Sequence, residues 1–212
     1  MTIDEALGAG APPIMAILRG VQPFEAVTVG QALVDAGIRL IEVPFNSPEP
    51  EQSIAALNDA FGRDAAIGGG TILTTHMVDA LSAAGGRFMV SPNCNPGVIA
   101  HAVACGIEPV PGFVTPTEAF AATEAGARRL KLFPGSAFSP AYLSALRDVL
   151  PADTGIWIVG GVSEANFADW HAKGAAGFGL GGSLYRRGDD AVTIGQRAQK
   201  MIAAWDDIKS AN

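Results

Sequence analysis

The amino-acid sequence predicts an α/β protein, a single-domain (β/α)8 TIM barrel that spans residues 1–212 and has a short helix before its first strand. Short apolar runs alternate along the whole chain with segments whose apolar residues have helical spacing. The runs end in Gly, Pro, Thr or Asn, which are typical of loops. With 49% hydrophobic residues, a chain of 212 residues can bury one sizeable core and little more, so we expect one domain.

Eight apolar runs are expected to form the strands, and each is followed by a helical segment. The strands are expected at residues 14–19, 40–45, 66–71, 88–92, 107–112, 129–134, 156–161 and 177–182. The helices are expected at residues 23–36, 49–61, 74–84, 95–105, 116–125, 140–150, 163–173 and 190–208. Several helices are preceded by a side chain suited to cap them, namely Ser47, Thr74, Asn95, Thr115, Ser139 and Ser163.

Eight strand–helix units favour a closed barrel over a doubly wound open sheet. The open sheet usually has five or six strands, and no Gly-x-Gly-x-x-Gly motif opens a first helix here. In a barrel of this kind the active site forms at the C-terminal ends of the strands. The residues that end the apolar runs are therefore the candidates for function.

Composition excludes several classes of function. The formal net charge is −7 and basic residues are not clustered, which argues against nucleic-acid or anionic-membrane binding. Cys94 and Cys105 lack CxxC spacing and the three histidines are not grouped, so the spacing predicts neither a disulfide scaffold nor a zinc site. Without a signal peptide or an apolar stretch of roughly 20 residues, we expect a cytoplasmic protein.

Lys131 is the first candidate for chemistry, because it lies among bulky apolar neighbours near the end of the sixth expected strand. Burial disfavours the ammonium form and lowers the pKa of a lysine, and a neutral amine can attack a ketone to form an imine. The alternative is a lysine at the exposed tip of the strand, paired with a carboxylate for structural reasons. The strand context alone does not decide between these two interpretations.

Glu42 lies inside the second apolar run, where a carboxylate must face a polar partner or an active site. In an imine mechanism it is suited to general acid/base catalysis, moving protons during carbinolamine formation, dehydration and bond cleavage. The structural alternative is that Glu42 serves only as the charge partner of Lys131.

Further strand-end residues are suited to bind an anionic substrate. The guanidinium of Arg19 can hold a carboxylate through two parallel hydrogen bonds, although it could equally form a surface ion pair. Thr71 adds a hydroxyl after three glycines, which either admit a ligand or serve only barrel packing. Paired glycines end the last two strands, where many barrels bind phosphate through backbone N–H groups, and this predicts a phosphate site at Gly160, Gly161, Gly181, Gly182 and Ser183.

Seven short motifs stand out when the strand ends are taken in order. They are Ala16-Ile17-Leu18-Arg19-Gly20, Ile41-Glu42-Val43-Pro44-Phe45-Asn46-Ser47-Pro48, Gly68-Gly69-Gly70-Thr71, Ser91-Pro92-Asn93, Pro111-Gly112, Lys131-Leu132-Phe133-Pro134 and Val159-Gly160-Gly161-Val162. Their order and spacing resemble the KDPG/KHG aldolase family, over about residues 13 to 187. The resemblance implies a (β/α)8 class I aldolase without a cofactor or metal, commonly homotrimeric, with Lys131 as the Schiff-base lysine and Glu42 as the acid/base.

The resemblance also implies the substrate class, a phosphorylated 2-keto-3-deoxy sugar acid that is cleaved to pyruvate and glyceraldehyde 3-phosphate. Asn46, Asn93 and Phe133 join the expected substrate-binding residues. Asn46 is a departure, because the phosphogluconate enzymes of the family place a carboxylate-binding arginine there. Carboxylate binding then falls to Arg19 with help from Thr71, which favours the branch that acts on the phosphogalactonate keto acid. The alternative is the phosphogluconate epimer, or activity on both.

Three other functions remain open at this point. A phosphosugar isomerase or epimerase on the same barrel needs an acid/base pair and phosphate loops but no imine. A metal-dependent pyruvate aldolase is disfavoured, because the sequence has no cluster of His and acidic ligands. A barrel that only binds sugar phosphates would leave the lysine and glutamate of apolar strands without a purpose.

Gly69 is a second departure from the family motif, because the family usually has alanine at this position; we expect this change to be tolerated.

Overall fold

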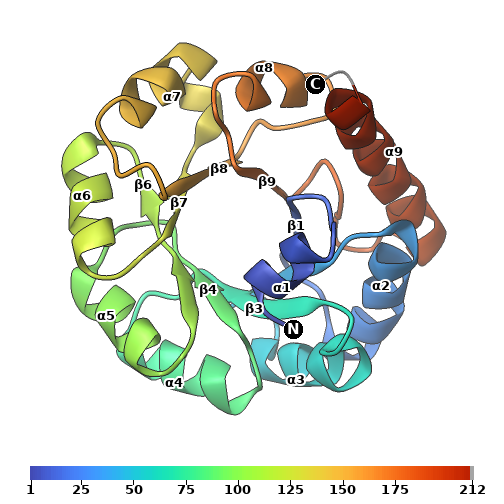
Figure 1. Ribbon diagram of the computed structural model, residues 1–212. Helices are drawn as coiled ribbons and strands as arrows, with labels where there is room; N and C mark the ends of the chain where they lie inside the picture. Colours follow the sequence, from blue (N-terminus) through green and yellow to red (C-terminus); the bar gives the residue numbers. More distant parts are fainter. Residues whose placement is uncertain (211–212) are drawn as a thin grey trace.

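The structure is a computed structural model that describes residues 1–210, and it confirms the (β/α)8 barrel with a short N-terminal helix (Figure 1). The strands are β1 (Ile14–Ile17), β2 (Leu40–Pro44), β3 (Ala66–Gly70), β4 (Phe88–Val90), β5 (Glu108–Val110), β6 (Gly112–Phe113), β7 (Arg129–Leu132), β8 (Gly155–Val159) and β9 (Gly177–Leu180). The helices are α1 (Ile3–Gly8), α2 (Pro23–Ala36), α3 (Pro50–Phe61), α4 (Thr75–Ala83), α5 (Pro96–Ala104), α6 (Pro116–Glu124), the 3-10 helix η1 (Gly135–Ala137), α7 (Pro140–Arg147), α8 (Phe167–His171) and α9 (Ala191–Ser210). Residues 211–212 of the expected domain lie outside the described part of the chain.

The fifth expected strand is split into β5 and β6 by Pro111. Proline has no N–H to donate to a neighbouring strand, so it interrupts the ladder. All the paired strands are parallel, in the order β5-β4-β3-β2-β1-β9-β8-β7-β6. The two ends of this order are the halves of one strand, and the carbonyl of Pro111 accepts the N–H of Lys131 at 2.8 Å. The ring of strands is therefore closed.

The expected helix caps were right for α4, α5 and α6 but wrong for α3 and α8, and Ser139 stands at the N-cap position of α7 without a capping hydrogen bond from its side chain. The hydroxyl of Ser47 does not cap α3, which begins after Glu49, and accepts instead the N–H of Gly20 at 2.9 Å. Ser163 lies ahead of α8, which begins after Asn166. The confirmed caps, whose side chains accept a backbone N–H of the first helical turn, are Thr74, Asn95 and Thr115.

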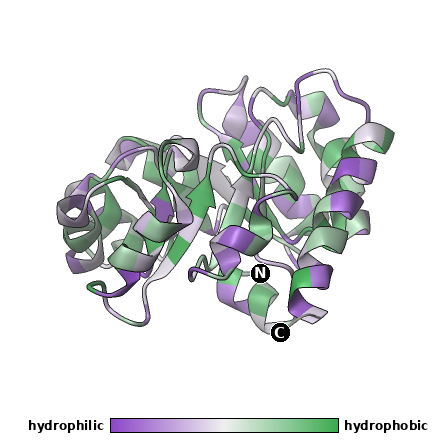
Figure 2. Cartoon of the chain, turned by 90° about the horizontal axis from the view of Figure 1, so that it is seen from above, coloured by the Kyte–Doolittle hydropathy of each residue, from purple (hydrophilic) through white to green (hydrophobic). Residues whose placement is uncertain are grey.

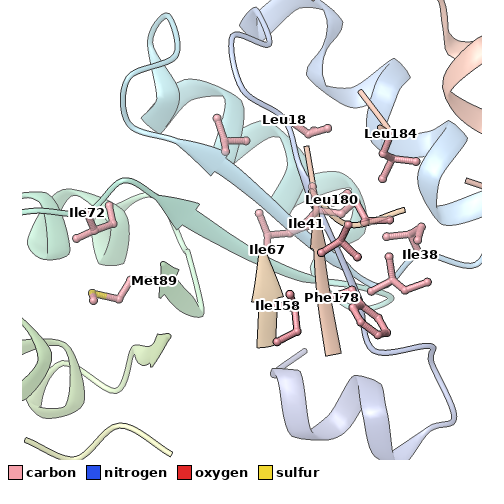
Figure 3. Packing of buried hydrophobic residues seen from close by; sticks show 14 of the residues in the cluster. Leu18, Ile38, Ile41, Ile67, Ile72, Met89, Ile158, Phe178, Leu180 and Leu184 are labelled. Atoms are coloured by element: carbon pink, nitrogen blue, oxygen red, sulfur yellow. The ribbon is translucent and has the colours of Figure 1, made fainter. Parts of the chain in front are cut away.

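Successive side chains of each strand point to opposite faces, and the outward ones pack against the helices. Figure 3 shows this layer, with Ile41, Ile67 and Phe178 directed away from the strands that carry them and Leu184 close by. In Figure 2 the strands are mostly green to white, whereas the helices alternate between green and purple. The main core is therefore the shell between barrel and helices. Within residues 1–210, no helix combines the length and the apolar character that crossing a membrane requires.

The inward side chains form a second, smaller core that α1 closes. Ile3 and Ala6 of α1 pack with Met15, Leu40 and Trp157 near the N-terminal ends of their strands. Inward glycines make room for the largest rings: a Cβ at Gly68 would lie 2.6 Å from Phe88, and one at Gly177 would lie 2.7 Å from Trp157. These inward apolar side chains form an apolar plug that fills the N-terminal end of the barrel, and the site residues lie beyond it, towards the other end.

Candidate active site

Two buried ionisable side chains face the inside of the barrel beyond the apolar plug. Glu42 on β2 lies two residues after inward-facing Leu40, and Lys131 on β7 pairs in register with Trp157 on β8. The exposed fraction is 2% for Glu42 and 6% for Lys131. Among the described residues Glu42 Oε2 has no hydrogen-bond partner, and no ion pair joins Glu42 to Lys131. The structure therefore gives no support to the alternative that Glu42 is merely the charge partner of Lys131.

The surroundings of Lys131 favour its neutral amine. Burial lowers the pKa of Lys131, the charge of Glu42 opposes this shift, and the charge of Arg19 adds to it. The ammonium position lies 4.5 Å from the centroid of the Phe133 ring, which offers partial compensation for the lost water. The sequence-based expectation of a lysine tuned for nucleophilic attack agrees with this environment.

The pKa of Glu42 is shifted in the opposite sense. Burial raises it from 4.5 to about 7, against the attraction of the charges on Lys131 and Arg19. A carboxyl group with a pKa near 7 is populated in both its acid and its base form around neutral pH. Such a group can give a proton and take one back within a single reaction cycle.

Gly70 provides the space that Glu42 occupies. A Cβ on Gly70 would lie 1.8 Å from Glu42 Oε2, so the carboxylate could not keep its present position. At the adjacent Gly69 a Cβ would meet only side chains, with Leu81 at 2.9 Å and Phe45 at 3.0 Å. The three glycines of β3 therefore have different roles, since Gly68 serves packing and Gly70 serves the site. Sequence reasoning treated them as one group and missed the specific role of Gly70.

Arg19 and Asn46 lie together at the ends of β1 and β2. Arg19 Nη1 donates to Asn46 Oδ1 at 2.6 Å, and both residues are exposed. The sequence predicted that Asn46 leaves carboxylate binding to Arg19, and the structure adds that the amide of Asn46 holds the guanidinium in place. Because the acceptor is neutral, the charge of Arg19 stays available for an anion.

Thr71 follows β3 in a left-handed backbone conformation, with φ 57°. This conformation is unfavourable for a β-branched residue and is found mainly where the surroundings enforce it. Here the carbonyl of Gly70 accepts the N–H of Phe45 at 2.7 Å, and the N–H of Ile72 donates to Val90 at 3.1 Å. The strained position of Thr71 is therefore fixed from both sides and presents its side chain at the strand end.

Backbone N–H groups without an acceptor mark the ends of β8 and β9. Within the described part of the chain, none of the recorded hydrogen bonds uses the N–H of Gly161, Gly182 or Ser183. Gly160 and Gly161 are left-handed, with φ 91° and 75°. A Cβ on Gly182 would meet nothing within 4 Å, so the space beside this strand end is open. Free donors beside open space are what a phosphate group requires.

Asn166 braces the first of these loops and was missed by sequence reasoning. Its amide donates to the carbonyl of Gly161 at 2.9 Å, and its Oδ1 accepts the N–H of Ser163 at 3.1 Å. An Asn three residues after Ser163 is a weak signal in sequence.

Two predicted residues remain, Asn93 and Gly181. Asn93 is exposed, and its carbonyl accepts a hydrogen bond from the buried hydroxyl of Ser91 at 2.7 Å. Gly181 accepts the N–H groups of Leu184 and Tyr185, which shapes the turn after β9.

A family model described as "KDPG and KHG aldolase" matches residues 4–195. This chain belongs to the KDPG and KHG aldolase family. Its members are carbon–carbon lyases. The 2-dehydro-3-deoxy-6-phosphogalactonate aldolase of Escherichia coli K12 is 48% identical over 193 residues, which cover 91% of this chain and 94% of that protein.

Two solved structures extend the likeness to the fold. One, described as native KDPGal, has a TM-score of 0.92 and 46% identity and covers 93% of this chain and 96% of that chain. The other is a cube-shaped porous cage designed by fusing symmetric oligomeric domains; it has a TM-score of 0.93 and 46% identity, and covers 94% of this chain and 74% of that chain. The family resemblance seen in the sequence motifs is thus confirmed, and the site belongs to a KDPG and KHG aldolase family barrel.

Proposed function

We propose that the protein is a class I aldolase that cleaves 2-dehydro-3-deoxy-6-phosphogalactonate to pyruvate and glyceraldehyde 3-phosphate. The observation that carries this proposal is the buried pair of Lys131 and Glu42, with opposite pKa shifts and no ion pair between them. The similarity to a relative named for this substrate supports the choice of the galactonate epimer.

Imine formation begins when the neutral amine of Lys131 attacks the C2 ketone of the bound keto acid. The attacking nitrogen gives up a proton and the ketone oxygen takes one, which gives a carbinolamine, and a further proton on its hydroxyl lets it leave as water. Glu42 moves these protons, since both of its forms are populated near neutral pH. The product is a protonated imine, which accepts an electron pair from the substrate.

Cleavage follows when Glu42, directly or through a water, removes the proton of the C4 hydroxyl. The C3–C4 bond breaks, its electron pair moves into the imine, and glyceraldehyde 3-phosphate leaves with a new aldehyde at C4. The remaining enamine is protonated at C3, and water then releases pyruvate and regenerates the amine of Lys131. All the atoms and electrons of these steps come from substrate, water and the two side chains.

Binding residues fix the two ends of the substrate. Arg19, held by Asn46, binds the carboxylate together with Thr71. The phosphate binds the unpaired N–H groups of Gly161, Gly182 and Ser183. In the same proposal Gly160, Gly181, Asn93 and Phe133 line the space between these ends.

Borohydride trapping tests the chemistry. Incubation with pyruvate and borohydride should reduce the imine to a stable amine on Lys131, which peptide mass spectrometry locates. Activity that survives this treatment would favour an isomerase or epimerase that needs no imine. Rates of pyruvate release from the 6-phosphogalactonate and 6-phosphogluconate keto acids, measured side by side, test the epimer; a faster reaction with the gluconate epimer would overturn that part of the proposal.

We further propose a cytoplasmic homotrimer. The similarity to a chain used in a cage of symmetric oligomeric domains supports self-association. Two exposed apolar side chains, Phe24 at 84% and Val192 at 70%, are suited to an interface. Light scattering after size-exclusion chromatography should give three times the 21.7 kDa mass of the chain, and a monomer mass at micromolar concentration would contradict the trimer.

A further inference from the structure

Helices α4 and α5 are neighbours on the outside of the barrel (Figure 1). Three side chains with metal-binding atoms, carried by these two helices and the residue after α5, meet there. Asp79 comes from α4, His101 from α5, and Cys105 directly follows α5. His101 Nε2 lies 2.6 Å from Asp79 Oδ1 and 3.7 Å from Cys105 Sγ. The three ligand atoms all lie within 4.8 Å of one another. This Asp79–His101–Cys105 cluster is separate from the barrel interior.

The backbone fixes two of the three ligands. His101 and Cys105 are four residues apart, so they lie on one face of the same helical turn. The N–H of Cys105 donates to the carbonyl of His101 at 3.0 Å, which keeps that turn closed. Asp79 approaches from the adjacent helix, and its partner is 22 positions away in sequence. This is why the spacing of cysteines and histidines predicted no zinc site.

The direction of approach distinguishes a metal site from an activated thiol. A Cys–His–Asp relay uses both ring nitrogens, one for the carboxylate and one for the thiol. Here the carboxylate and the thiol both approach Nε2 of His101. Three different donors that converge on one point are suited to share a cation. A plain ion pair between Asp79 and His101 would not need Cys105.

We propose that Asp79, His101 and Cys105 form a surface site for a thiophilic divalent cation, best matched by Zn²⁺, that links α4 to α5. Thiolate, imidazole and carboxylate are all zinc ligands, whereas Mg²⁺ and Ca²⁺ prefer oxygen alone. Ligands about 2.0–2.3 Å from a tetrahedral ion lie roughly 3.3–3.8 Å apart. The separation of Cys105 from His101 already fits, and the shorter contact of Asp79 with His101 opens as the ion enters.

Binding changes protonation but no oxidation state. The thiol of Cys105 releases its proton to solvent as the sulfur–zinc bond forms, and His101 binds through its neutral ring. Three protein ligands leave the fourth position of the ion to water. Zinc affinity should therefore fall as the pH is lowered, because protons compete for the ligands.

Zinc titration of the metal-free full-length protein against a chromophoric zinc indicator tests the site. We expect one tight equivalent per chain in the wild type. Cys105→Ser and His101→Asn should weaken it by more than the roughly 10- to 100-fold that the loss of an outer-sphere partner costs. Cys94→Ser is the matched control, because Cys94 lies outside the cluster and its thiol donates to the carbonyl of Glu118 at 3.3 Å. This variant should keep the full equivalent.

Co²⁺ absorption provides a second readout, which distinguishes a Cys105 that binds the metal from one that only supports the fold. Co²⁺ bound at the site should show a sulfur-to-metal charge-transfer band in the near ultraviolet, absent from Cys105→Ser and present in Cys94→Ser. A wild type without a tight equivalent, or a Cys105→Ser variant that keeps both the equivalent and the band, would overturn the proposal. Since these readouts do not involve catalysis, they stand apart from the fate of the aldolase proposal.

Discussion

The two ends of the barrel differ in whether their charged side chains form ion pairs, and strand β7 carries an example of each. On β7, Arg129 lies near the N-terminal end, where its guanidinium forms ion pairs with Glu108 of β5 and Asp4 of α1. Two residues further along the same strand, Lys131 has no ion pair among the described residues. Arg129 therefore fastens α1 to the barrel, whereas Lys131 is left chemically free.

The cost of each arrangement differs accordingly. A buried charge that is paired and hydrogen-bonded recovers part of its desolvation energy, whereas an unpaired one shifts its pKa towards the neutral form. The N-terminal end combines ion pairs with an apolar plug and contributes stability. The C-terminal end keeps a buried lysine, a carboxyl oxygen (Glu42 Oε2) without a hydrogen-bond partner among residues 1–210, and a strained Thr71, all of which cost stability. The comparison teaches that this fold separates the residues that hold it together from those that react.

Exchanging the two cations of β7 for methionine tests this division most strongly. Lys131→Met should lower kcat by at least about 10⁴-fold, because no other side chain replaces the nucleophile, while its thermal stability stays equal or rises. Arg129→Met should keep kcat within a few-fold but lower the free energy of unfolding by about 1–2 kcal/mol, since the half-buried Glu108 loses its partner. Kinetics and thermal unfolding of the pair measure both effects. Equal loss of stability in the two variants would remove the distinction.

Glu42→Gln separates catalysis from stability at one position. We expect kcat to fall by about 10²–10⁴-fold, since the amide cannot shuttle protons. The pKa of Glu42 is raised from 4.5 to about 7 on folding, so the folded wild type binds this proton more tightly than the unfolded chain. The resulting stability is complete below about pH 4.5 and is lost as the pH rises through about 7.

The neutral variant does not suffer that loss. Relative to the wild type, Glu42→Gln should therefore gain stability between about pH 5 and pH 8, by roughly 3 kcal/mol at most. Denaturant unfolding at the two pH values measures the difference. If the stability of Glu42→Gln relative to the wild type rose towards low pH instead, Glu42 would have to be ionised and paired in the folded state, as the charges of the N-terminal end are.

Adjacent glycines of β3 provide a matched pair with a smaller expected effect. Gly70→Ala should lower kcat by about 10²-fold or more, because its methyl group would displace the carboxylate of Glu42. Gly69→Ala should leave kcat nearly unchanged, because flexible side chains of Leu81 and Phe45 can move by the few tenths of an ångström required. Steady-state kinetics of both variants decide. A larger loss in Gly69→Ala would place the sensitive contact on the outer face of the strand.

The architecture could be predicted from the sequence because it rests on local patterns. Apolar runs and helical spacing are properties of consecutive residues, so strands such as β2 and helices such as α2 were placed within one or two residues. The split of the fifth strand follows from a single proline and was missed, because the run remained apolar through Pro111. The early end of α7 and the late start of α8 depend on tertiary contacts that periodicity does not report.

The site was predictable in its residues but not in its contacts. Lys131 and Glu42 could be chosen because a charge in an apolar run is rare, and Arg19 because it ends a strand. That Asn46 holds Arg19, and that Gly70 makes room for Glu42, depends on side chains from different strands meeting in space. The same holds for the Asp79–His101–Cys105 cluster, whose ligands come from two helices.

The smallest expected effect concerns Arg19, a cation of the C-terminal end that is held by a neutral side chain. Arg129 is held by carboxylates, which neutralise it, whereas Arg19 is held by the neutral amide of Asn46, which orients it and leaves its charge for a ligand. Asn46→Ala should raise KM for the keto acid by up to about tenfold with little change in kcat, because one hydrogen bond contributes about 1 kcal/mol to the position of the guanidinium. In an Arg19→Ala background the same change should have no further effect, since a positioning residue has nothing left to position. Additive effects in this double-mutant cycle would mean that Asn46 contacts the substrate itself, and the contrast between a neutralised and an oriented arginine would then rest on Arg129 alone.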